Sequence, residues 1–163
     1  MIISEKEFAE LCKKNPALNR YNTQTPSAKT NKYRNVKIYV YASGAVLGDK
    51  SMTDKFGPVI DVFDSQKEYL RYKELVLLER AGKISKLERQ VPMTIQEKCC
   101  QNGSQIKAIV YKADFCYIRG GKEIVEDVKP LDKASGKYRL TKDFSLKWKL
   151  LKAKYPNKTF EIF

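Results

Sequence analysis

The sequence predicts a mixed α/β (α+β) fold, in which a central mixed β-sheet is flanked by helices. Three observations support this class. Residues 106–119 and 122–129 are rich in β-forming residues and are separated by Gly120-Gly121, a strong signal for a two-residue hairpin. Residues 65–81 and residues 138–155 instead repeat their apolar residues at helical spacing.

The first predicted helix, 65–81, has clear start and stop signals. Ser65 and Glu68 have the spacing of a capping box, and Gly82 is a typical residue just after a helix C-terminus. Its buried face is predicted to contain Tyr69, Tyr72, Leu75, Val76 and Leu78. The second helix, 138–155, is predicted to bury a stripe of Leu140, Phe144, Trp148, Leu151 and Tyr155.

Further strands are predicted at 36–42, 59–63, 87–95 and 156–163. A glycine-rich loop joins the first two of these strands. In 87–95, strict alternation would place one set of side chains on a single face: Leu87, Arg89, Val91, Met93 and Ile95. Residues 96–105 are predicted to be a turn.

The length of 163 residues is sufficient for one domain with a hydrophobic core. We predict a short helix and a flexible basic arm in residues 1–31, followed by a globular domain in 32–163. The four cysteines form no C-x-x-C pair and are expected to be reduced thiols. Because no apolar run approaches ~20 residues and no signal peptide is evident, we expect a cytoplasmic protein without a membrane partner.

The charge composition is strongly basic. Thirty-two Lys and Arg residues against nineteen acids give a formal net charge of +13, which suggests a polyanionic partner. The alternative is that the lysines only make the surface soluble. The chain has no histidine, which excludes Ser–His and Cys–His catalysis and histidine-based zinc sites. Chemistry in this protein must therefore use carboxylates, lysines, hydroxyls, thiols or a hard metal ion.

The hairpin places two acids opposite each other. If Gly120-Gly121 forms the loop, paired residue numbers sum to 241, so Asp114 faces Asp127 and both share a face with Lys129. Carboxylates at ~5 Å repel, and a divalent metal beside Lys129 would stabilise them. Glu126 is predicted to point to the opposite face, as an outward or inter-element polar residue. The alternative is a solvated hairpin face on which acids and lysines are mixed.

These residues resemble the PD-(D/E)XK nuclease superfamily. The pattern is an acid on one strand, a hairpin, and acid-x-Lys on the next strand, preceded by a helix with a Glu. More narrowly, 63–90 followed by 111–130 resembles small phage and prophage endonucleases related to Holliday-junction resolvases and to the transposon end-cleaving endonuclease. The resemblance implies that 32–163 is a nuclease domain with a restriction-endonuclease-like core.

The resemblance also implies roles for individual residues. Its expected catalytic set is Glu68, Gln90, Asp114, Asp127 and Lys129. The expected ligands of Mg²⁺, for which Mn²⁺ would substitute, are Asp114, Asp127, Glu68 and the backbone carbonyl of Val128. Ala113 and Pro130 depart from the pattern, where proline and glycine are more usual, without removing a ligand. Glu68 could equally serve as the acid of the capping box alone.

The basic residues near the C-terminus form the expected nucleic-acid surface. From 129 to 154 there are nine Lys or Arg residues and two acids, and lysines on an outer helix face can contact phosphates. The expected contacts are Lys133, Lys137, Arg139, Lys142, Lys147 and Lys149. An ordinary solvated helix face is the alternative explanation for any one of them.

Taken with its charge, the resemblance implies a Mg²⁺-dependent endodeoxyribonuclease acting on duplex or branched DNA. It further implies a role in phage DNA recombination, replication or packaging, with junction selectivity and a homodimer as additional expectations. Two alternatives remain open. One is a non-catalytic nucleic-acid-binding module on a nuclease-like scaffold, and the other is a nuclease or binding protein directed at RNA.

Overall fold

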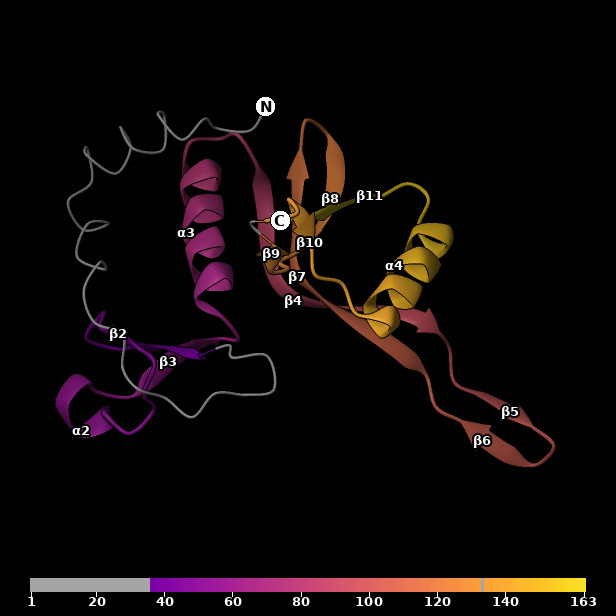
Figure 1. The fold of residues 1–163 in the computed structure, drawn as a ribbon, viewed down its shortest axis with the longest axis horizontal. Helices are drawn as coiled ribbons and strands as arrows, with labels where there is room; N and C mark the ends of the chain where they lie inside the picture. The colour runs from indigo at the N-terminus through magenta and orange to yellow at the C-terminus, as the bar shows by residue number, and fades with distance from the viewer. Residues whose placement is uncertain (1–35, 133) are drawn as a thin grey trace. The chain divides into compact units, whose positions relative to one another are not determined.

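The computed structural model describes residues 36–132 and 134–163 (Figure 1). The chain divides into two compact units, with the boundary between Gln66 and Lys67. This boundary lies inside the predicted domain 32–163. The predicted N-terminal helix and basic arm, residues 1–31, lie outside the described residues.

The first unit contains a small antiparallel sheet with the strand order β2-β1-β3. Its elements are β1 (Ile38–Tyr41), β2 (Val46–Leu47), α2 (Thr53–Phe56) and β3 (Val59–Phe63). Tyr41 and Phe63 are its fully buried aromatic side chains. The two predicted strands are confirmed, and the loop between them contains β2 and the short helix α2.

The second unit contains a mixed four-stranded sheet with two longer helices. Its elements are α3 (Gln66–Arg80, whose first residue precedes the boundary), β4 (Ser85–Gln96), β5 (Cys99–Gln101), β6 (Ser104–Ile106), β7 (Ile109–Arg119), β8 (Lys122–Asp127), β9 (Leu131–Asp132), β10 (Lys137–Tyr138), α4 (Lys142–Lys154) and β11 (Thr159–Ile162). The main sheet has the order β11-β8-β7-β4. β11 is parallel to β8, and the other pairs are antiparallel, so the mixed α+β class is confirmed.

The register of the β7–β8 hairpin is the one predicted. The paired residues run from Arg119 with Lys122 to Phe115 with Glu126, and every pair sums to 241. Gly120 and Gly121 have φ of 57° and 76°, the left-handed conformation that a type I′ turn requires and that glycine adopts without strain. The ladder ends before Asp114 and Asp127, so these two acids do not form the predicted cross-strand pair.

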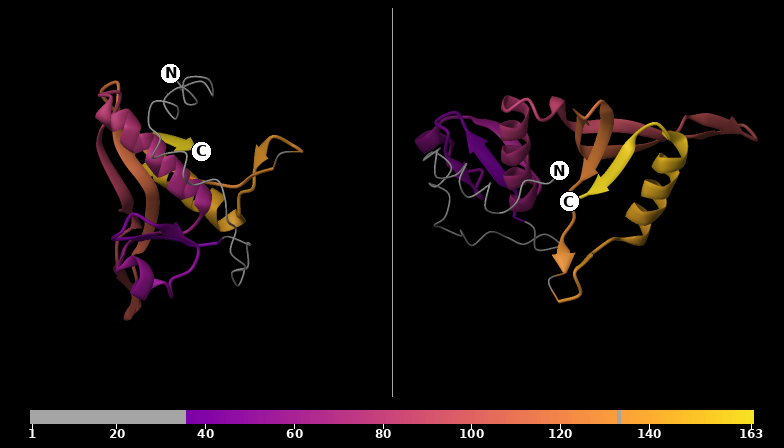
Figure 2. Two further views of the ribbon diagram at one scale, coloured as in Figure 1. Left: turned by 90° about the vertical axis from the view of Figure 1, so that its left-hand side faces the viewer. Right: turned by 90° about the horizontal axis from the view of Figure 1, so that it is seen from above.

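Each face of the main sheet is covered by one helix. On one face, Leu75 of α3 packs with Phe115, Tyr117 and Ile124, together with Ile84. On the other face, α4 contributes Phe144, Trp148 and Leu151 to a cluster that also contains Met93, Ala113 and Val125. Ile124 and Val125 are neighbours on β8, and their opposite directions place the two helices on opposite faces (Figure 2).

The predicted helix 65–81 is confirmed as α3, with Tyr69 and Leu75 buried and the other predicted positions partly buried. The second helix begins later than predicted, at Lys142 and not at residue 138. Residues 137–138 pair with 131–132 as the β9–β10 hairpin, which prevents an earlier helix start. Leu140 therefore lies outside α4 and is exposed.

Thr141 is the N-cap of α4, because its hydroxyl accepts a hydrogen bond from the Phe144 amide at 3.1 Å. We expect Thr141→Ala to lower the free energy of unfolding by about 1 kcal/mol, since this amide loses its acceptor. Thr141→Ser keeps the oxygen and should cost no more than a few tenths of a kcal/mol. Urea unfolding measures both variants, and an equal loss in the two would contradict the capping role.

Two sequence predictions for the 87–105 region are wrong in detail. The side chains of 87–95 do not all share one face, because Gln90 has a φ of 53° and interrupts the alternation. The Arg89 guanidinium lies 4.8 Å from the centre of the Tyr72 ring on α3, whereas Met93 belongs to the α4 cluster. Residues 96–105, predicted as a turn, mostly form the β5–β6 hairpin.

The cysteines within the described residues, Cys99, Cys100 and Cys116, are free thiols, as predicted. Cys116 packs against the α4 cluster, while the other two are exposed. Over the part of the chain that the structure describes, no helix is both long and apolar enough to cross a membrane.

Candidate functional site

Gln90 links three elements of the second unit. Its side-chain amide nitrogen donates to Oε1 of Glu68 on α3 at 3.0 Å and to Oδ1 of Asp114 on β7 at 3.3 Å. The positive φ of Gln90 is uncommon for a residue with a side chain, and such conformations concentrate at functional sites. The structure thus brings together three of the predicted catalytic residues around one amide group.

Asp114 is also bound to the segment that follows β8. Its Oδ2 accepts a hydrogen bond from the backbone amide of Val128 at 2.8 Å. The sequence-based expectation was that the carbonyl of Val128 would face the site, but the contact with Asp114 is made by its N–H group. Both carboxylate oxygens of Asp114 are therefore hydrogen-bonded, one to Gln90 and one to Val128.

Asp127 is almost fully buried and has different partners. Its Oδ1 accepts a hydrogen bond from the Tyr111 hydroxyl, and its Oδ2 forms an ion pair with the Lys129 ammonium. The same ammonium lies 4.3 Å from the centre of the Phe144 ring of α4. The predicted proximity of Asp127 and Lys129 is therefore present, on the face covered by α4.

Burial changes the proton affinity of the polar groups here. Desolvation lowers the pKa of Lys129, although the carboxylates of Asp114 and Glu68 act in the opposite direction. Burial, assisted by Asp114, raises the pKa of Tyr111, so its hydroxyl keeps the proton that it donates to Asp127. The negative charges of Asp114 and Glu68 therefore favour the protonated form of Lys129, against the effect of its burial.

The backbone of 127–129 is fixed from two directions. Lys67 donates from Nζ to the carbonyl oxygen of Lys129 at 2.8 Å. Phe163, which follows β11, donates its amide to the Asp127 carbonyl and accepts from the Lys129 amide, both at 2.9 Å. These bonds continue the parallel β8–β11 pairing and hold the acid-x-Lys segment in an extended conformation.

Glu126 is an inter-element residue, one of the two predicted alternatives, and it is not outward. Its carboxylate is 1% exposed and accepts two hydrogen bonds from Arg71 of α3, each at 2.7 Å, and one from the Tyr117 hydroxyl at 2.8 Å. Arg71 also donates to Glu74 at 2.8 Å. Glu126 does lie on the face opposite to Asp127, as predicted, but there it ties α3 to the sheet.

Sequence reasoning missed Tyr111 and Arg71. Arg71 follows Glu68 by three residues, so both lie on the same side of α3, and this spacing was the available signal. A tyrosine within a β-rich run carries no comparable signal, because aromatic residues are common in strands for packing reasons.

The oxygen donors of the site determine whether it could hold the expected Mg²⁺. Glu68 and Asp114 present carboxylate oxygens, the hard donors that Mg²⁺ prefers, and both are directed at the Gln90 amide. Both oxygens of Asp127 are engaged by Tyr111 and Lys129. Across residues 36–132 and 134–163, no three acidic or cysteine side chains converge into a metal-binding group. The oxygen donors of Glu68 and Asp114 match the preference of Mg²⁺ in kind, and both oxygens of Asp114 are also hydrogen-bonded in this structure.

The predicted nucleic-acid contacts lie on β10, α4 and the segment between them. Lys137, Lys142 and Lys149 are exposed. Arg139 pairs with Asp132 at 3.3 Å, and Lys147 pairs with Asp143 at 3.1 Å. Exposed pairs of this kind contribute little to stability and can be exchanged for phosphate contacts. Lys133 lies outside the described residues.

The second unit is thus an α+β domain in which three carboxylates, one amide and one lysine, each buried or partly buried, are contributed by α3 and by the strands of a mixed sheet or their ends. The chain belongs to the family described as "Protein of unknown function (DUF1064)", whose model matches residues 53–162. No curated protein matches the sequence.

Proposed function

We propose that this protein is a metal-dependent endonuclease that hydrolyses phosphodiester bonds in DNA. The observation that carries the proposal is the Gln90 amide, which joins the carboxylates of Glu68 and Asp114, together with the Val128 amide, which joins Asp114 to the segment of Asp127 and Lys129. The residues of the predicted set come from three strands or their ends and from one helix, and the bonds of Gln90, Val128 and Lys129 link them.

The fold of the second unit also supports the proposal, because it can be compared with the restriction-endonuclease-like core that the resemblance implies. Along the chain, the second unit has the order α3, β4, β7, β8, α4, β11, and its central mixed sheet has one helix on each face. This is the architecture that the resemblance to PD-(D/E)XK nucleases implies. In it, the acid-x-Lys segment lies at the end of a strand inside the sheet, between β7 and β11.

Glu68 and Asp114 would hold a Mg²⁺ ion, with Asp127 next to them. When bound, such an ion lowers the pKa of a coordinated water and neutralises charge on the phosphate. Lys129 would supply a further positive charge, and its interaction with nearby charges is less screened because its side chain is only 22% exposed. Asp127 and Phe144 orient the ammonium, and Tyr111 orients Asp127.

Gln90 has a positioning role in this proposal. By donating to both carboxylates, its amide holds Glu68 and Asp114 at a short separation without adding a charge. The Val128 amide fixes the second oxygen of Asp114, so the carboxylate cannot rotate freely. Because these groups are already in place, little free energy is needed to reorganise them during the reaction.

The exposed lysines of β10 and α4 would contact the phosphate backbone of the substrate. Such contacts bind duplex or branched DNA with little base specificity. Junction selectivity and action as a homodimer, in phage recombination, replication or packaging, are parts of the proposal that depend on the resemblance.

A non-catalytic DNA-binding protein is the second candidate. The observation that favours it is the double engagement of Asp127 by Tyr111 and Lys129, which leaves only two carboxylates around the Gln90 amide. Such a protein would keep the basic surface but hydrolyse nothing. A binding protein directed at RNA would have the same site and a different substrate preference.

The test is a cleavage assay with Mg²⁺ or Mn²⁺ on a labelled four-way junction, a nicked duplex and a linear duplex, with matching RNA duplexes. We expect metal-dependent cleavage that EDTA abolishes. Asp127→Asn should reduce the rate by on the order of 100-fold while DNA binding is retained, because Lys129 loses its anionic partner.

Asp143→Asn is the matched control, since it makes the same chemical change at an exposed position of α4. It should cleave at the wild-type rate. Equal lack of cleavage by all three proteins on every substrate would contradict the nuclease proposal and favour the binding protein. Cleavage of RNA alone would reject DNA as the substrate.

A further inference from the structure

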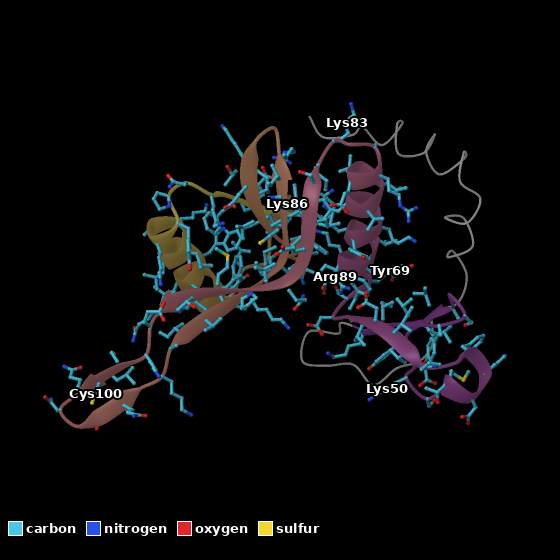
Figure 3. All side chains as sticks on the ribbon, turned by 180° about the vertical axis from the view of Figure 1, so that it is seen from behind. Lys50, Tyr69, Lys83, Lys86, Arg89 and Cys100 are labelled. Carbon is cyan, nitrogen blue, oxygen red and sulfur yellow. The ribbon has the colours of Figure 1, made fainter. Side chains whose placement is uncertain are left out.

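The second unit carries a projecting two-stranded ribbon, which we define as residues 97–108. Its core is the β5–β6 pairing, from Cys99 with Ile106 to Gln101 with Ser104. Every residue from 96 to 110 is exposed. Figures 1 and 2 show the ribbon extending away from the main sheet, and Cys100 marks it in Figure 3. Within the described residues, no other element buries the ribbon.

The ribbon is an ordered hairpin. Asn102 and Gly103 have φ of 50° and 76°, the pair of left-handed residues that a type I′ turn uses. This turn matches the twist of the two strands that it joins. Because β4 and β7 pair up to Gln96 and Ile109, the ribbon starts from a rigid base.

The charge of the ribbon favours an anionic partner. Lys98 and Lys107 flank the base of its ladder, and no acidic residue occurs from Lys98 to Ala113. Glu97, the acid that precedes this stretch, pairs with Lys154 of α4 at 3.5 Å. The end of the ribbon is polar and uncharged, with side chains that both donate and accept hydrogen bonds: Gln101, Asn102, Ser104 and Gln105.

The base of the ribbon adjoins the lysine-rich helix α4. Besides the Lys154–Glu97 pair, the hydroxyl of Tyr155 donates to the Thr94 carbonyl at 2.9 Å. These contacts join the C-terminal end of α4 to β4 just before the ribbon begins. The cations of α4 and those of the ribbon therefore belong to connected parts of one unit.

We propose that the ribbon enters a groove of duplex DNA, with Lys98 and Lys107 on the phosphates and Gln105, which shares their face of the ribbon, at the base edges. The major groove of B-form DNA is wide enough for a two-stranded β-ribbon, and glutamine can bond adenine there. The major groove of an RNA duplex is too deep and narrow for this. A second copy of the ribbon fits poorly, because the lysines would repel. The inference rests on the proposed function, which supplies DNA as the substrate.

The test measures binding of the full chain to a linear DNA duplex in EDTA, over a range of salt concentrations, by fluorescence anisotropy. Lys98→Ala/Lys107→Ala should weaken binding at least about tenfold and reduce the slope of log K against log salt by about 1.8, the value for two lost phosphate contacts. Gln105→Ala should weaken binding with an unchanged slope. Neither variant should alter binding to an RNA duplex of the same sequence.

Lys83→Ala/Lys122→Ala is the matched control. It removes the same charge from exposed residues at the far end of the sheet, where β4 begins and β7 turns into β8. Figure 3 shows Lys83 at the end opposite Cys100. An equal effect of the two lysine pairs on the salt slope would overturn the proposal. A change of oligomeric state in the Lys98→Ala/Lys107→Ala variant, measured by analytical ultracentrifugation, would assign the ribbon to contacts between copies and also overturn it.

The ribbon and nuclease proposals can fail separately. Ribbon-dependent DNA binding without cleavage in Mg²⁺ or Mn²⁺ would contradict the nuclease and support the ribbon. Metal-dependent cleavage with unchanged DNA binding in both ribbon variants would support the nuclease and contradict the ribbon proposal. A wild-type chain that binds no DNA would overturn the ribbon proposal together with its premise.

Discussion

Asp114→Asn is expected to reduce DNA cleavage by on the order of 1,000-fold or more, because this carboxylate is central to the candidate site. Asp114 joins Gln90 on β4 to the Val128 amide after β8, and it raises the proton affinity of nearby Lys129. Asparagine has almost the same shape but only one acceptor oxygen. Its NH₂ group must therefore face one of two hydrogen-bond donors, and the negative charge is lost. Single-turnover cleavage of the best substrate in Mg²⁺ measures the effect.

Two controls separate chemistry from folding in this variant. Asp143→Asn should keep wild-type activity, as in the assay proposed above. The affinity of Asp114→Asn for DNA in EDTA should stay within about threefold of wild type, since the expected DNA contacts are made by surface lysines. A variant that remains folded by circular dichroism and still cleaves at the wild-type rate would remove Asp114 from the reaction.

The second large effect is expected on stability. Arg71→Met should lower the free energy of unfolding by about 3–5 kcal/mol, since it leaves the Glu126 carboxylate buried without its cation. Glu126 is 1% exposed, and the guanidinium supplies two of its three hydrogen bonds. Urea unfolding followed by fluorescence or circular dichroism measures the change.

Arg119→Met is the matched control for Arg71→Met. Arg119 also pairs with a glutamate, Glu161, but both side chains are about one-third exposed, so the loss should be under about 1 kcal/mol. The double variant Arg71→Met/Glu126→Gln should recover part of the stability, because no buried charge remains unpaired. If Arg71→Met costs no more than Arg119→Met, the buried pair does not have the proposed importance.

Local signals in the sequence were sufficient for much of the fold. Gly120-Gly121 fixed the β7–β8 register, because a two-residue turn allows only one pairing of the strands. Ser65 and Gly82 bracketed α3 to within about one residue. From this register it also followed that Asp127 and Glu126 point to opposite faces, which the structure bears out.

The remaining features depend on tertiary contacts that no local pattern contains. The positive φ of Gln90 reverses the alternation of β4, so counting along the strand misplaced Arg89. Asp114 and Asp127, which were expected to face each other, instead have separate partners. Asp114 bonds the Gln90 side chain and the Val128 amide, whereas Asp127 bonds the Tyr111 hydroxyl. The sequence left Glu126 open between an outward and an inter-element position, because its partner, Arg71, lies on α3, 55 residues earlier in the chain.

The bonds from Phe163 to residues 127 and 129 have a consequence for synthesis of the protein on the ribosome. Phe163 lies just beyond β11, whereas the acid-x-Lys segment is translated more than thirty residues earlier. The hydrogen bonds that hold the Asp127 and Lys129 backbones cannot form until residues 159–163 have left the exit tunnel. A nascent chain that already contains Glu68, Gln90, Asp114, Asp127 and Lys129 therefore still lacks the strand that aligns its last two site residues.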